Sequence, residues 1–198
     1  MTNSEIKLGN LIDQDLYRMS DVEFGKSRSK FINTDQETYG VPLPTIKKLV
    51  RKYLNEYTLD SDPSSLEKEA MYLLEQPIFD SKIAGIQILS IMSEEKLLAD
   101  TKIIEGVIQY TTDWALVDTL ATDVVAVILR NNPNEVDSLI DWTKSDNNWL
   151  RRCSIVSLIK TKDHIKNWKE YKRDMLDRLI HENDPYVKKS IKWLKSTY

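Results

Sequence analysis

The stretch TDWALVDTLA, residues 112–121, places an aspartate directly before an apolar helical pattern, and the arrangement recurs along the chain. It returns in FDSKIAGIQIL (79–89), SDNNWLRRCSIVSL (145–158) and NDPYVKKSIKWL (183–194). The aspartates are Asp80, Asp113, Asp146 and Asp184, spaced by 33, 33 and 38 residues. Each is placed to cap its helix, because a carboxylate accepts hydrogen bonds from the N–H groups of a first turn.

Apolar residues recur at intervals of three and four along most of the chain, which predicts amphipathic helices. Only five glycines and six prolines occur, and Pro44 is placed to start one helix. The predicted helices span residues 41–57, 64–76, 80–93, 101–111, 113–131, 134–145, 147–161, 167–182 and 185–197, with two more near 4–18 and 21–33.

Helix pairs at this period are typical of HEAT-like and related α-solenoids. We therefore predict an all-α fold, a HEAT-like α-solenoid of paired antiparallel helices with one concave face. It would form a single repeat domain over residues 1–198. The second helices of the repeats, near 80–93, 113–131, 147–161 and 185–197, are expected to line the concave face.

The bulk composition excludes several classes of protein. The 198 residues are 41% hydrophobic and 30% charged, which is too apolar for disorder. No apolar run approaches the roughly 20 residues that a membrane span requires. The N-terminus lacks the pattern of a signal peptide, and the one cysteine, Cys153, cannot form an intramolecular disulfide. We expect an intracellular monomer, cytoplasmic or on the nucleoid if the organism is bacterial.

Charge is distributed unevenly. The net charge is −3, but the segment from Leu150 to the end carries 13 Lys and Arg against 6 Asp and Glu. A basic segment can bind nucleic acid even on an acidic protein. The alternative is a solvated, lysine-rich helix surface. Two histidines and one cysteine, far apart in sequence, are a poor basis for a zinc site, and no metal or other cofactor is expected.

Helical spacing brings several polar and aromatic residues to one predicted groove. Trp114 and Asp118 share a face at i,i+4, as do Lys189 and Trp193. Arg152 lies beside the inward face of the helix between them. Residues predicted to pack inward are Leu116, Val117, Leu120 and Val124, then Leu150, Cys153, Ser154 and Leu158, then Val187, Ile191 and Leu194. A groove of one carboxylate and two indoles suits a cation.

Each member of this set also has a purely structural interpretation. A tryptophan in an α-solenoid is most often core, and we expect Trp142, Trp149 and Trp168 to be buried or partly buried. Asp118 alone could be a solvated residue or the partner of an arginine. Arg151 and Arg152 could be a surface pair. The coincidence across three successive helices favours the groove.

From Glu37 to Trp193 the chain resembles the DNA alkylation repair family, the AlkD-like HEAT-repeat alkylpurine DNA glycosylases. Four segments in order carry the resemblance: ETYGVPLPTIKKLVRKY (37–53), DWALVD (113–118), NNWLRRCSIVSL (147–158) and YVKKSIKWLKSTY (186–198). It implies excision of cationic N3- or N7-alkylated purines from double-stranded DNA, without flipping the base into a pocket.

The resemblance also implies roles for individual residues. Asp118 would be the catalytic carboxylate, and Trp114 and Trp193 would pack against the sugar beside the lesion. Arg152 would hold a phosphate, with Arg151 as the other candidate. Further DNA-binding candidates are Lys26, Arg28, Lys30, Lys47, Lys48, Arg51, Lys52, Lys188, Lys189 and Lys192.

Three hypotheses follow from the sequence. The first is a monofunctional DNA glycosylase for alkylated purines. The second is a catalytically inactive HEAT-like protein that binds distorted or branched DNA. The third is a protein-interaction scaffold, which predicts a buried Trp114 and no DNA binding. The combination of Trp114, Asp118, Arg152 and Trp193 favours the first.

Overall fold

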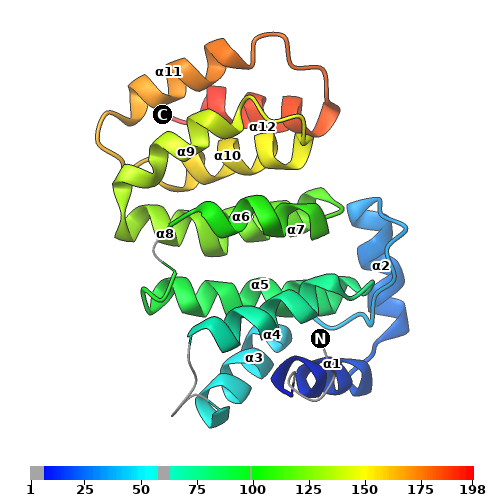
Figure 1. Ribbon diagram of the computed structural model, residues 1–198. Coiled ribbons are helices and arrows are strands. Elements are labelled where there is room, and N and C mark those ends of the chain that lie inside the picture. The colour runs from blue at the N-terminus through cyan, green and yellow to red at the C-terminus, as the bar shows by residue number, and fades with distance from the viewer. Residues whose placement is uncertain (1–6, 58–62, 99) are drawn as a thin grey trace. The chain divides into compact units, whose positions relative to one another are not determined.

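The computed structural model describes residues 7–57, 63–98 and 100–198, and the regular structure within them is helical (Figure 1). The predicted all-α class is confirmed, although residues 4–6 of the first predicted helix lie outside the described ranges. The chain divides into two compact units, residues 1–92 and 93–198, which are described one at a time. The single domain over 1–198 stays a prediction.

The described residues of the first unit form five helices, and a buried glutamate caps the first of them. The helices are α1 (Leu8–Arg18), α2 (Val22–Ile32), α3 (Leu43–Tyr57), α4 (Pro63–Glu75) and α5 (Phe79–Glu94). Glu69 of α4 accepts hydrogen bonds from the backbone N–H groups of Lys7, at 3.1 Å, and Gly9, at 2.7 Å. It thus supplies the cap that Lys7, at the N-cap position of α1, cannot supply.

Asp80 does not cap α5, contrary to the sequence prediction, because its carboxylate faces the segment between α2 and α3. It accepts from the backbone N–H groups of Tyr39 and Val41, each at 2.8 Å. It also accepts from the Thr38 hydroxyl at 2.7 Å and from the Arg28 guanidinium at 2.6 Å. The side chain is fully buried. Asp80 therefore holds a connecting segment in place.

We expect Asp80→Asn to lower the free energy of unfolding by about 2–4 kcal/mol, because the largely buried guanidinium of Arg28 would lose its charged partner. Urea denaturation of the full chain measures this change. The control is Glu67→Gln, at an exposed position on the neighbouring helix α4, which should stay within about 0.5 kcal/mol of the wild type. Equal stability of the two variants would show that the carboxylate is not a structural anchor.

In the second unit, the residues that the structure describes form three successive helix pairs. The first pair is α6 (Lys102–Val107) with the continuous helix made of α7 (Trp114–Leu120), the π-helical turn Ala121–Val125 and α8 (Ala126–Asn131). The others are α9 (Val136–Trp142) with α10 (Asn148–Lys160), and α11 (Trp168–Arg178) with α12 (Pro185–Ser196). All three predicted second helices of this unit are present within one or two residues of their expected bounds.

Two of the three predicted helix caps in this unit are confirmed. Asp113 accepts from the N–H groups of Ala115 and Leu116 at the start of α7. Asp184 does the same for Tyr186 and Val187 at the start of α12. At α10 the prediction is off by one residue, since the capping side chain is Asn147 and Asp146 is exposed. An asparagine is as good a cap as an aspartate, and Asn147 directly precedes the first turn.

The second helices of the three pairs run in the same direction. Asp118 near the start of α7 pairs with Arg152 near the start of α10, and Ser157 reaches the Ala121 carbonyl one turn later. Between α10 and α12, Trp149 contacts Tyr186 and Lys160 contacts Trp193. Such parallel stacking of second helices is what a helical repeat array requires.

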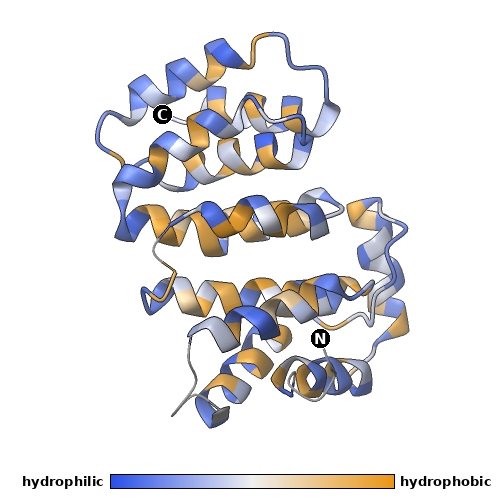
Figure 2. Ribbon diagram, viewed as in Figure 1, coloured by the Kyte–Doolittle hydropathy of each residue, from blue (hydrophilic) through white to orange (hydrophobic). Residues whose placement is uncertain are grey.

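Helix α10 is enclosed by its neighbours, because it packs against α7, α9, α11 and α12. All residues predicted to pack inward on α7–α8, α10 and α12 are buried. Arg152, expected beside the inward face, is also buried, and it lies between Asp118 of α7 and the Tyr186 carbonyl of α12. Figure 2 shows hydrophobic and hydrophilic residues interleaved along these helices, as amphipathic packing requires.

Candidate functional site

The central feature of the second unit is a bidentate pair between Asp118 and Arg152. The Arg152 Nε donates to Asp118 Oδ1 at 2.8 Å, and Nη2 donates to Oδ2 at 2.7 Å. The Arg152 side chain is 8% exposed and that of Asp118 is 24% exposed. Parallel hydrogen bonds of this kind fix the orientation of both groups. The carboxylate is therefore held rigidly at an edge that solvent still reaches.

Arg152 also connects its ion pair with Asp118 to helix α12. Its Nη1 donates to the backbone carbonyl of Tyr186, in the first turn of α12, at 2.6 Å. One guanidinium thus joins the carboxylate of α7 to the start of α12. The role of Arg152 as a phosphate ligand stays a prediction, and within the protein its guanidinium binds Asp118 and the Tyr186 carbonyl.

Burial raises the pKa of Asp118 above its usual value, and the hydrogen bonds and charge of Arg152 oppose this effect only in part. The charge of Lys160 also opposes it. Desolvation disfavours the ionised form of an acid, whereas a neighbouring cation favours it. The two cations therefore favour the ionised form of the carboxylate against the effect of burial.

Trp114 is the first residue of α7, directly after the cap Asp113 and one turn before Asp118. It is half-buried. The π-helical turn begins three residues after Asp118, and such turns are frequent at functional sites. Complete burial of Trp114, which the scaffold hypothesis predicts, is not observed.

Trp193 is exposed on α12, with 39% of its surface accessible. The ammonium of Lys160, at the end of α10, lies 5.0 Å from the centre of its ring. Lys160 also acts electrostatically on Asp118, so it is connected to both predicted site residues. Lys160 was not among the residues predicted from the sequence, although Arg152, Val156 and Lys160 recur at i, i+4 and i+8 on one face of α10.

Aromatic rings and lysines continue along α12 from this point. Tyr186 packs against Trp149 with ring centres 5.2 Å apart, and the Lys189 ammonium lies 5.6 Å from the Tyr186 ring. Tyr186, Lys189 and Trp193 follow at i, i+3 and i+7 and so share one face of the helix. Lys188, Lys189 and Lys192 are all exposed.

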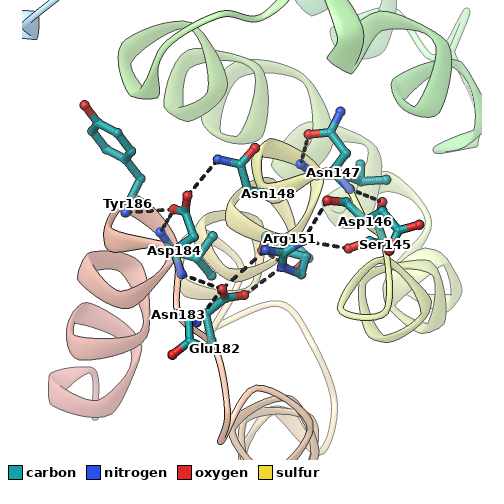
Figure 3. A network of polar contacts seen from close by, with 12 residues as sticks. Ser145, Asp146, Asn147, Asn148, Arg151, Glu182, Asn183, Asp184 and Tyr186 are labelled. Atoms are coloured by element: carbon teal, nitrogen blue, oxygen red, sulfur yellow. Dashed lines mark hydrogen bonds and ion pairs between the residues drawn. The ribbon is translucent and has the colours of Figure 1, made fainter.

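Arg151 has a structural role on the other side of α10 (Figure 3). Its Nε and Nη2 donate to the carboxylate of Glu182 at 2.7 and 3.3 Å, and its Nη1 donates to the carbonyls of Ser145 and Asp146. Burial acts to raise the pKa of Glu182, but the hydrogen bonds from Arg151 and from the Asp184 N–H outweigh it, and the pKa is lowered. Arg151 thus anchors the segment that leads into α12.

The remaining basic candidates lie in the first unit. Lys48, Arg51 and Lys52 are exposed on α3, and Lys47 is half-buried there. On α2, Lys26 pairs with Glu23, whereas Lys30 is exposed. Arg28 binds Asp80 and the Val41 carbonyl, so its side chain is part of the anchored segment described above.

The described residues include no group of three or more His, Cys, Asp or Glu side chains arranged to bind a metal ion. Burial raises the pKa of Cys153 to about 12, so its thiol stays protonated. No helix within the described ranges combines the length and apolar character of a membrane span. The tryptophans Trp142 and Trp168 are buried and Trp149 is half-buried, as predicted.

Comparison with known proteins assigns the fold and then the family. The fold is similar to that of a solved structure, described as a predicted DNA alkylation repair enzyme from Enterococcus faecalis. The TM-score is 0.73 at 16% sequence identity, covering 88% of this chain and 81% of that chain. A comparison with curated proteins gives no match. The sequence model of the DNA alkylation repair enzyme family matches residues 12–196. The chain belongs to this family, and its role is in DNA repair.

Proposed function

We propose that this protein is a monofunctional DNA glycosylase that excises cationic N3- and N7-alkylated purines from double-stranded DNA without base flipping. The observation that carries the proposal is the geometry of Asp118. A carboxylate that is partly exposed and rigidly held, one turn after Trp114, is suited to stabilise positive charge that develops on a bound sugar.

The chemistry requires few groups from the protein. Alkylation at N3 or N7 makes the purine cationic, so the base leaves with the electrons of the C1′–N bond and needs no general acid. Positive charge then develops on the sugar, as in glycoside hydrolysis. Asp118 stabilises this charge and accepts a proton from the water whose oxygen bonds to C1′. No metal ion or other cofactor takes part.

The indoles of Trp114 and Trp193 are proposed to pack beside the lesion. Stacking of a cation on an indole contributes about 0.5–2 kcal/mol for each ring. Trp193 is exposed enough to contact a ligand directly. The exposed lysines of α12, Lys188, Lys189 and Lys192, are proposed to bind the DNA backbone, with Lys47, Lys48 and Arg51 as further candidates in the first unit. We propose that the protein acts inside the cell as a monomer.

We expect the purified full chain to release 7-methylguanine and 3-methyladenine from methylated duplex DNA and to leave abasic sites. Chromatography of the free bases measures the release, and unmethylated DNA of the same sequence is the control. No release after prolonged incubation with excess protein, while the protein still binds DNA, would refute the glycosylase proposal.

One observation favours a second candidate, a catalytically inactive DNA-binding protein. Both oxygens of Asp118 accept hydrogen bonds from Arg152, so the carboxylate can be explained as a structural partner of a buried arginine. This candidate predicts salt-dependent binding to distorted or branched DNA with no abasic product. The base-release assay separates the two candidates directly.

A further inference from the structure

We infer that the phosphate ligand of this site is Lys160, and that neither Arg151 nor Arg152 holds the DNA backbone. The inference deepens the proposed function and rests on it, since it assumes that DNA lies against Trp193 and Asp118. The ligand is a phosphodiester oxygen of the strand that carries the alkylated purine.

Both arginines use their guanidinium groups for hydrogen bonds within the protein. Arg152 makes three hydrogen bonds, two to Asp118 and one to the Tyr186 carbonyl, and its side chain is only 8% exposed. Arg151 uses Nε, Nη1 and Nη2, and its side chain is 17% exposed. A phosphate would have to approach a guanidinium that is largely buried and already paired with a carboxylate, which is costly.

Lys160 differs from the two arginines because its charged group is exposed to solvent. It is exposed, and within the described residues its ammonium forms no ion pair or hydrogen bond with the protein. Its contact is with the ring of Trp193, at 5.0 Å, and this contact leaves the donors of the ammonium available. A lysine is a compact point charge that binds phosphate well.

The electrostatics of the site require an anion at this place. The proposed reaction develops positive charge beside Asp118, where Arg152 and Lys160 already contribute two positive charges. Like charges oppose one another, so an uncompensated ammonium beside Trp193 would counteract the cation that the indole is proposed to stabilise. A phosphate bound to Lys160 removes this conflict. Arg152, which is paired with Asp118 on both oxygens, continues to favour the ionised carboxylate when Lys160 binds the phosphate.

The geometry also predicts how DNA is positioned. Lys160 and Trp193 come from different helices, α10 and α12, and their contact joins a phosphate-binding group to the exposed indole. A phosphate held there would place the attached sugar against Trp193. Because a phosphate carries no sequence information, the same contact forms on undamaged DNA.

The test is the salt dependence of binding to an undamaged duplex, measured by fluorescence anisotropy with the full chain. We expect Lys160→Gln to reduce the slope of log K against log salt by about 0.9, the value of one phosphate contact. Lys160→Arg should retain the wild-type slope. The matched control is Lys166→Gln, since Lys166 is also exposed in this unit and has no contact with Trp193 or Asp118 among the described residues.

Each outcome decides the question. A reduced slope for Lys160→Gln alone supports the inference. An unchanged slope for Lys160→Gln, or equal reductions for Lys160→Gln and Lys166→Gln, overturns it. The readout is independent of catalysis, because the duplex carries no lesion. If the wild type releases no base while Lys160→Gln lowers the slope, the glycosylase proposal fails and the phosphate site stands.

Discussion

Replacing Asp118 by asparagine is expected to lower the rate of 7-methylguanine release from methylated duplex DNA by about 10²–10³-fold. The physical reason is the loss of a negative charge held at the edge of the site, since the amide can still accept one hydrogen bond from Arg152 but cannot stabilise a cationic sugar. Single-turnover assays with excess protein measure the rate of the chemical step.

The control for Asp118→Asn is Asp141→Asn, which removes an equal charge from an exposed carboxylate in the same unit. It should release the base at the wild-type rate. Affinity for undamaged DNA should be similar in both variants, because neither change removes a cation. Wild-type release by Asp118→Asn would show that this carboxylate is structural and that the catalytic group lies elsewhere.

The pH dependence of the wild type follows from the same group. Release requires the ionised form of Asp118, so the rate should fall as the pH decreases through the pKa of this residue. Because burial raises that pKa, the fall should begin at a higher pH than for an ordinary aspartate. A rate that stays constant down to the usual range of aspartate would contradict this expectation.

The second large effect is expected for Arg152→Met. This change keeps most of the side-chain volume but leaves Asp118 without its partner. Breaking a buried pair costs about 3–5 kcal/mol, and the 24% exposure of Asp118 places the expected loss of unfolding free energy nearer to about 2–4 kcal/mol. Urea denaturation at neutral pH measures this loss, and Arg152→Lys should recover part of it.

The Arg152→Met variant should also change how the free energy of unfolding depends on pH, in a direction that follows from the pKa of Asp118. Without the guanidinium, the pKa of Asp118 rises further, because burial acts unopposed by its main partner. A carboxyl whose folded-state pKa is raised favours the folded state below its unfolded pKa, and this contribution is lost as the pH rises. The stability deficit of the variant should therefore shrink as the pH is lowered towards 4. A deficit that does not vary with pH would indicate lost packing rather than an unpaired carboxylate.

The same variant separates two roles of Arg152. If Arg152 only keeps Asp118 ionised and oriented, the rate of base release should recover as the pH is raised, while DNA affinity changes little. If Arg152 holds a phosphate, the salt dependence of DNA binding should weaken at every pH. The contacts with Asp118 and the Tyr186 carbonyl favour the first result.

The sequence alone predicted the helices and much of the core. A period near 33 residues, set by an aspartate and an apolar helix, identified three second helices that the structure contains in the second unit. Spacing of three and four residues identified their buried faces, because a helix has a fixed geometry. The caps Asp113 and Asp184 could be predicted for the same reason, since a cap depends on the few residues around it.

Side-chain partners could not be predicted in this way. The aspartate of the first repeat, Asp80, has the same local pattern as a cap, yet it binds a segment about 40 residues earlier in the chain. Arg151 and Arg152 are adjacent and chemically identical, but one binds Glu182 and the other binds Asp118. Adjacent helical positions point about 100° apart, and only the packing of neighbouring helices decides what each one meets.

The sequence by itself thus determined which residues form helices, which of their faces are buried, and that one carboxylate, one arginine and two indoles are spread over three successive second helices. Tertiary structure alone decided that Asp118 is paired, that Arg152 is buried and that Lys160 lies over Trp193. The physical reason is the separation along the sequence over which each interaction acts. Periodicity and capping follow from the backbone of a few residues, whereas ion pairs and cation–π contacts join side chains more than 30 residues apart, brought together by the stacking of α7, α10 and α12.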